Sequence, residues 1–180
     1  MTGCGSSKQV AATKEQVKAT RGAKLDKEEC EEKALESGKR ASGIGLSQSE
    51  RLAKNTAALD ARANLQKAVQ SILIGMIKNF DQEHQAGANA GKTSDFVNQS
   101  GEEQKGLIDG VLSSRIICSN TYIQDDGSYK VYVCVEMNDE SIGNLHKKLS
   151  ADKKISIQFE EKKFREEMDK ELERYRESQQ

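Results

Sequence analysis

The sequence predicts an α+β fold in which a small antiparallel β-sheet, an edge strand plus a β-hairpin, packs on one long α-helix, with additional C-terminal helices. Three observations favour this fold. The spacing Ser47-Gln-Ser-Glu50 is that of a capping box, and a long stretch with helical periodicity follows it. The short segment 40–45 contains two glycines and leads directly into this helix, as an edge strand would. Two segments of alternating polarity, joined across Asp126-Gly127, form the hairpin.

The long helix is expected to run from about Ser47 to His84. Its first half is rich in alanine, and its second half carries larger apolar residues at helical spacing. The alanines are Ala53, Ala57, Ala58, Ala61 and Ala63, and the larger residues are Leu65, Val69, Ile72, Met76 and Phe80. Because alanine favours helix and lets a neighbouring backbone come close, we expect the first half to lie tightly on the sheet. The second half should fill the core.

The hairpin strands are expected at about 116–124 and 129–137, with a type I′ turn at Asp126-Gly127. Pairing Asp125 with Ser128 sets a register in which Cys118 opposes Val135. The face that meets the helix then carries Ile116, Cys118, Tyr122, Val131, Val133, Val135 and Met137. Cys118 and Cys134 point to opposite faces in this register, so we do not expect them to pair.

The C-terminal third predicts two charged helices. One begins at Asn138 or Asp139 and ends near Leu149, and the other covers about 159–177. The second helix has a narrow apolar stripe formed by Phe164, Met168, Leu172 and Tyr175. The stripe is expected to pack on this domain, although a partner-binding or coiled-coil face has the same pattern.

The N-terminal sequence Met1-Thr2-Gly3-Cys4 matches a bacterial lipobox, in which the cysteine thiol carries the lipid. Cys4 is therefore the predicted lipid-attachment residue, and a signal peptide would lie upstream; the alternative is an ordinary N-terminal cysteine. The following residues are polar and charged, so 1–38 is interpreted as a lipobox remnant and flexible tether, with the folded domain at 39–178. A short helix within 25–36 is compatible with the pattern. Cys30 is expected to be the most exposed cysteine.

Composition excludes several function classes. The chain has 180 residues, a formal net charge of −1 and 4% aromatic residues. This charge argues against nucleic acid as a partner, which would need a basic stripe. His84 and His146 have no histidine or cysteine at metal-ligand spacing. No catalytic residues, metal ligands or cofactor site are predicted, and the chain is not expected to be an enzyme.

The loop Ala86-Gly-Ala-Asn-Ala-Gly-Lys92-Thr93 fits a loose phosphate-loop pattern. Such a loop needs backbone amides around a phosphate, a lysine on its charge, and a hydroxyl on magnesium, between a buried strand and a helix. Here the loop follows the polar end of a helix. We interpret it as a flexible connection between helices and retain nucleotide binding through Ala86 to Thr93 as a minority alternative.

Three segments together resemble the LPP-type ("LPP twenty") family of bacterial outer-membrane lipoproteins, in its Bacteroides-group version. They are Arg40-Ala-Ser-Gly-Ile-Gly45, the alanine helix with Asp60-Ala-Arg62, and Asp126-Gly-Ser-Tyr-Lys-Val-Tyr-Val-Cys-Val-Glu-Met137. The resemblance implies an α+β domain held at the outer membrane of the cell envelope by a lipid on Cys4. It implies no catalytic residue.

The expected function is that of a non-catalytic, membrane-tethered envelope lipoprotein, a structural or assembly module. Its partners would be other envelope proteins or further copies of this chain, contacted through the edge strand at 40–45 or the outer face of the sheet. The alternative is a small-molecule or lipid carrier in the periplasm, which would need a sizeable pocket.

Overall fold

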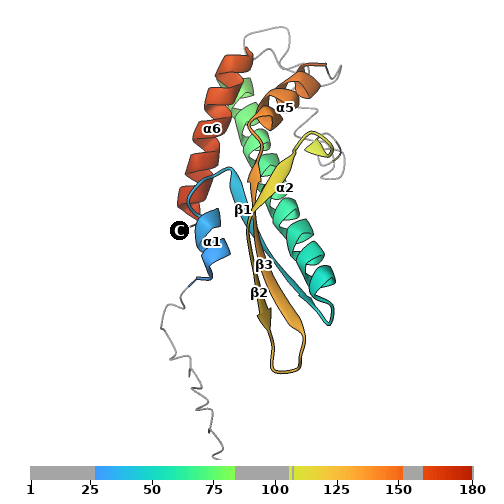
Figure 1. Ribbon diagram of the computed structural model, residues 1–180. Helices are drawn as coiled ribbons and strands as arrows, with labels where there is room; N and C mark the ends of the chain where they lie inside the picture. Colours follow the sequence, from blue (N-terminus) through green and yellow to red (C-terminus); the bar gives the residue numbers. More distant parts are fainter. Residues whose placement is uncertain (1–26, 84–105, 107, 152–159, 180) are drawn as a thin grey trace, which may run out of the picture.

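The computed structural model describes residues 27–83, 106, 108–151 and 160–179, and it confirms the predicted α+β fold (Figure 1). A three-stranded antiparallel sheet in the order β1-β3-β2 packs against the long helix α2. The elements are α1 (Glu29–Ala34), β1 (Arg40–Ser47), α2 (Glu50–Glu83), β2 (Ser114–Ile123), β3 (Tyr129–Met137), α5 (Glu140–Ala151) and α6 (Glu161–Ser178).

The long helix begins two residues after the position expected from the capping-box spacing. Ser47 is the last residue of β1, and its hydroxyl accepts a hydrogen bond from the backbone N–H of Ser49 at 3.1 Å. The first helical hydrogen bond runs from the N–H of Ala53 to the carbonyl of Ser49. Ser47 therefore shapes the turn between strand and helix, and Ser49 takes the capping position.

Strand β1 lies directly on the backbone of α2, as the alanine-rich half of the helix predicts. Ala53, Ala57 and Ala61 are fully buried. A Cβ at Gly45 would overlap the carbonyl oxygen of Ala53 and lie 2.6 Å from the backbone nitrogen of Ala57. A Cβ at Gly43 would lie 2.8 Å from the Cα of Ala61. Two glycines facing alanines thus bring strand and helix to a separation that larger residues would not permit.

The core lies between the sheet, α2 and the C-terminal helices. Val131, Val133 and Val135 of β3 are fully buried, and they belong to the same cluster as the large apolar residues of α2. From α6, Phe164, Met168 and Leu172 enter this cluster and are at most 1% exposed, which confirms that the α6 stripe packs on the domain. The side chain of Phe80 is outside the described residues.

The hairpin forms where expected, but the predicted register is wrong by one residue. Cys118 opposes Cys134, not Val135, and Tyr122 opposes Lys130, not Val131. The N–H of Gly127 bonds to the carbonyl of Gln124, and Gly127 has a φ of 80°. This is a three-residue loop with a left-handed glycine, one residue longer than the predicted type I′ turn.

The one-residue shift changes which side of the sheet the β2 side chains occupy. Residues directly opposite each other on antiparallel strands share a face. Cys118 and Tyr122 therefore lie on the outer face with Cys134 and Tyr132, and not against α2 as predicted. A bulge between Ile116 and Cys118 shifts the register again at the far end of β2.

The short helix α1 packs on the outer face of the sheet, so residues 28–38, assigned to the tether from sequence, are part of the folded structure (Figure 1). Glu28 caps this helix and accepts a hydrogen bond from the N–H of Cys30 at 2.8 Å. Cys30 is 0% exposed and forms a disulfide with Cys118. The expectation that Cys30 is exposed is therefore wrong. Its neighbours are mostly charged, and the sequence pattern did not show that one side of this helix is covered.

None of the helices in the described part of the chain is long and apolar enough to cross a membrane.

Candidate functional site

One edge of the sheet is closed by side chains of α2. The N–H of Ile44 donates to the Oδ2 of Asp60 at 3.0 Å, and the Nδ2 of Asn64 donates to the carbonyl of Ser42 at 3.0 Å. Asp60 and Asn64 are one helical turn apart, so together they cover outward-facing backbone groups of β1. The expectation that segment 40–45 offers an edge for strand addition is therefore wrong at these positions. In the sequence, Asp60 and Asn64 are two polar residues beside the alanines of α2. Their role in covering β1 can be recognised only when the position of β1 is known.

The other edge of the sheet is formed by β2, and within the described part of the chain no strand pairs with it. The N–H of Gln124 points towards β3, where it bonds to Ser128, so the backbone groups of Ser119, Thr121 and Ile123 point away from the sheet. No described residue hydrogen-bonds to these outward-facing groups. Exposed apolar side chains accompany them along the strand: Ile116 is 40% exposed and Ile123 is 72% exposed. This edge can pair with another strand.

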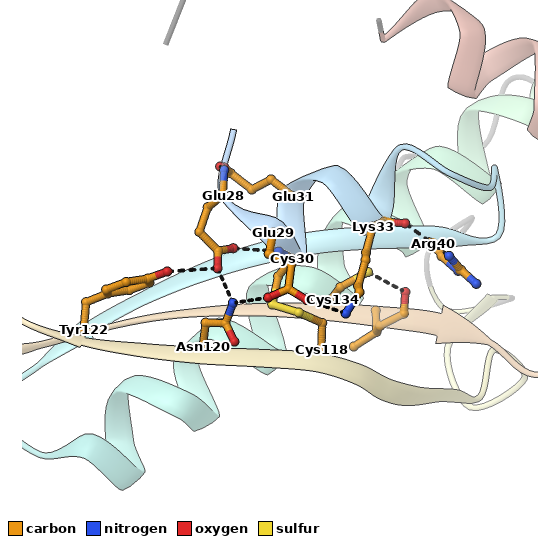
Figure 2. The surroundings of a disulfide bond; sticks show 11 residues. Glu28, Glu29, Cys30, Glu31, Lys33, Arg40, Cys118, Asn120, Tyr122 and Cys134 are labelled. Atoms are coloured by element: carbon orange, nitrogen blue, oxygen red, sulfur yellow. Dashed lines mark hydrogen bonds and ion pairs between the residues drawn. A yellow bond between two sulfur atoms is a disulfide. The ribbon is translucent and has the colours of Figure 1, made fainter. Parts of the chain in front are cut away.

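The outer face of the sheet holds a polar cluster around the N-terminal end of α1 (Figure 2). Asn120 donates to Glu28 at 2.5 Å and to Glu29 at 3.3 Å, and the hydroxyl of Tyr122 donates to Glu28 at 3.4 Å. Desolvation and the Glu28 carboxylate raise the pKa of the Tyr122 hydroxyl. These contacts and the Cys30–Cys118 disulfide attach α1 to β2.

Cys134 is a buried thiol directly opposite one half of that disulfide. It is 0% exposed and forms one cluster with Cys30 and Cys118. Burial raises the pKa of the Cys134 thiol to about 11. At neutral pH the side chain is therefore a neutral thiol, and its reactivity depends on a small thiolate fraction.

One carboxylate joins all three strands near the opposite end of the outer face. Glu136 of β3 pairs with Arg40 of β1 at 2.9 Å and with Arg115 of β2 at 2.6 Å. Hydrogen bonds from Arg115 and Arg40 lower the pKa of Glu136, and the pairing raises the pKa of Arg40. The Glu136 side chain is 19% exposed, so solvent screens these pairs incompletely.

We expect Glu136→Gln to lower the free energy of unfolding by about 1 kcal/mol at neutral pH, because both arginines lose a charged acceptor. The folded pKa of Glu136 lies below its ordinary value of 4.5, so this contribution is present above that pH and is lost as pH falls through the folded pKa. Urea unfolding of both proteins at a series of pH values measures the difference. A difference that stays constant down to pH 2 would contradict the assignment.

A groove of about 330 Å³ lies where α1, β1, α2 and α6 meet. Its lining includes Arg40, Lys67, Tyr175 and Arg176. Arg40 is already paired with Glu36 and Glu136, and Arg176 is paired with Glu173 at 2.8 Å. The volume is near the lower limit of small-molecule sites. It is the place that the carrier alternative would use.

Several residues considered from sequence fall outside the described part of the chain. These are Cys4, His84 and the loop from Ala86 to Thr93. The predictions of lipid attachment and of nucleotide binding therefore stay predictions. His146 is half-buried, and its ring centroid lies 5.3 Å from that of Phe164. Among the described residues, no group of three histidine, cysteine or acidic side chains has the geometry of a metal site.

Comparisons with family models, with curated proteins and with solved structures found no match to this chain.

Proposed function

We propose that this protein is a membrane-tethered envelope lipoprotein that acts as a non-catalytic assembly module, and that two copies join by strand addition at the β2 edge. The observation that carries the proposal is the difference between the two edges of the sheet. Asp60 and Asn64 close β1, whereas β2 keeps outward-facing backbone groups and exposed apolar side chains. Soluble proteins usually block such edges, and an open one serves strand pairing.

The charges on and beside β2 favour a second copy as the partner. Arg115 lies near the start of β2 with its side chain 72% exposed, and Asp125 and Asp126 follow its other end. When two copies of the strand pair antiparallel about their middle, Arg115 of each copy lies near the aspartate turn of the other. The interface is twofold symmetric and closes, because the same strand is used on both sides. Two three-stranded sheets then form one continuous sheet.

The proposed tether and location rest on the N-terminal half of the chain. Lipid attached to Cys4 would hold the domain at the outer membrane, as the resemblance to the LPP-type family implies. The Cys30–Cys118 disulfide supports an oxidising compartment, because such bonds persist in secreted and periplasmic proteins. Tethering also raises the effective concentration of neighbouring copies, so a weak strand pairing suffices.

The association is tested by measuring the mass of the full chain by light scattering over a concentration series. The unchanged chain is expected to form dimers. Ile123→Lys should weaken the dimer at least about tenfold, because an exposed apolar side chain is lost from the edge and a lysine on an edge strand opposes strand addition. The substitution is at a residue that is 72% exposed, so the fold of each copy is kept.

Leu46→Lys is the matched control, since Leu46 is 61% exposed on the strand whose edge α2 closes. It should leave the dimer unchanged. A chain that stays monomeric at every concentration, or a dimer that Leu46→Lys and Ile123→Lys weaken equally, would overturn the proposal. Cys4→Ser in cells is a separate arm: it should move the protein out of the membrane fraction without changing the mass of the purified dimer.

A further inference from the structure

The outer face of the sheet brings three cysteines from three different elements into one buried cluster (Figure 2). Cys30 comes from α1, Cys118 from β2 and Cys134 from β3, and none is more than 8% exposed. Cys118 is bonded to Cys30 and also lies directly opposite Cys134 in the sheet. It therefore has two possible disulfide partners, and it can bond to one of them at a time.

The backbone places both partners within bonding range of Cys118. The Cα atoms of Cys30 and Cys118 are 5.4 Å apart. Residues directly opposite each other on antiparallel strands have Cα atoms about 4.5–5.5 Å apart. Disulfides form at Cα separations of about 4.4–6.8 Å. A Cys118–Cys134 bond is thus compatible with the existing strand pairing, and β2 and β3 need not separate to form it.

We propose that this cluster is a site of intramolecular thiol–disulfide exchange that removes the covalent attachment of α1 to β2 and exposes Cys30 as a thiol. The Cys134 thiolate attacks the Sγ of Cys118. The Cys118–Cys134 bond forms as the Cys30–Cys118 bond breaks, and Cys30 leaves as a thiolate. It then takes up one proton, which balances the proton that Cys134 lost. One thiol and one disulfide are present before and after the step, so no oxidant or reductant is consumed.

The structure favours Cys30 over Cys118 as the leaving group. Both Cys118 and Cys134 are held by the sheet, whereas Cys30 belongs to a helix of six residues. Once the disulfide is exchanged, α1 keeps its hydrogen bonds from Asn120 and Tyr122 to Glu28 and its packing on the outer face. These are weaker constraints than a covalent bond, so Cys30 becomes accessible to thiol reagents.

The surroundings of Cys134 make the exchange slow at neutral pH and faster in base. The charged groups around it are Arg40 from β1, Glu136 from β3, and Lys33 and Glu36 from α1, and its neighbour on β2 is the disulfide sulfur of Cys118. Burial is the largest influence and raises the Cys134 pKa to about 11. Below that pH the thiolate fraction, and with it the rate, rises about tenfold per pH unit.

The exchange is measured by peptide mapping of the full chain carrying Cys4→Ser, which removes the N-terminal thiol. The oxidised protein is incubated at pH 7, 8 and 9, quenched with N-ethylmaleimide and digested with trypsin without reduction. Cleavage sites separate the three cysteines onto different peptides: Lys27, Lys33, Arg115, Lys130 and Lys147. We expect a Cys118–Cys134 peptide and an alkylated Cys30 peptide to appear in equal amounts. Their rate should rise about 100-fold from pH 7 to pH 9 and should not depend on protein concentration.

Two variants keep the test decisive. Cys134→Ser should leave Cys30 unalkylated under the same conditions. Cys30→Ser, treated with oxidised glutathione, should form the Cys118–Cys134 bond, which checks that the sheet accommodates the product. Four results would each overturn the proposal: no Cys118–Cys134 peptide from the Cys4→Ser chain at pH 9, no such bond in Cys30→Ser, a Cys30–Cys134 peptide in place of the expected one, or alkylation of Cys30 in Cys134→Ser.

Discussion

Val133→Asp is expected to lower the free energy of unfolding by about 4 kcal/mol or more, which is most of the stability of a typical small domain. Val133 is fully buried between β3 and α2, and its cluster is built from apolar side chains. The new carboxylate has to be buried without a charge partner or to separate strand and helix. Circular dichroism and urea unfolding measure the loss. A folded protein within about 1 kcal/mol of the unchanged chain would contradict the assignment of this core.

Tyr132→Asp is the control for this prediction because Tyr132 is the next residue on the opposite face. Its ring makes an edge contact with Tyr122 at 5.9 Å between centroids, and the amine of Lys130 lies 4.9 Å from the ring centroid. The aspartate there loses these contacts but stays near water and near a cation. We expect a loss of about 1 to 2 kcal/mol, clearly smaller than for Val133→Asp.

Gly45→Ala is expected to destabilise the protein by about 3 kcal/mol, although it adds a single methyl group. That methyl would overlap the carbonyl oxygen of Ala53, and neither backbone can move without separating β1 from α2. The hydrogen bonds from Ile44 to Asp60 and from Asn64 to Ser42 would be lost at the same time. Thermal unfolding should show the decrease, and hydrogen exchange should locate it in β1.

Gly75→Ala in α2 provides a matched comparison with the opposite sign. A Cβ at Gly75 meets nothing within 4 Å, and alanine is the better helix former. We expect a gain of about 0.5–1 kcal/mol. If Gly45→Ala were as harmless as Gly75→Ala, the close contact between strand and helix would not exist in solution.

Local patterns predicted the elements of this fold, because helical spacing and strand alternation are properties of short segments. The alanines of α2 even predicted which half of the helix lies tightly on the sheet. The hairpin register depends on whether the turn at Asp126-Gly127 has two or three loop residues, and the same turn sequence is compatible with both. That single residue decided which face Cys118 occupies.

The candidate sites were less predictable because each depends on contacts between distant segments. Asp60 and Asn64 have the appearance of ordinary exposed helix residues until β1 is placed beside them. Cys30 lies among glutamates and lysines, and its burial follows from the packing of α1 on the sheet. Likewise, β2 has an unpaired edge because the strand order is β1-β3-β2, and the sequence pattern does not specify that order.

The Cys30–Cys118 bond also determines how the domain would bear a mechanical load. It joins residues separated by 88 positions, so β1 and α2 lie inside a covalent loop. A pull on the N-terminal segment is transmitted through Cys30 directly to β2, and no tension reaches β1 or α2 along the chain. Most of α1 also lies inside this loop, so under force the first contacts to yield are those of the β2–β3 ladder. With the disulfide reduced, the same pull would peel β1 away from α2, so the redox state of one bond selects the unfolding path.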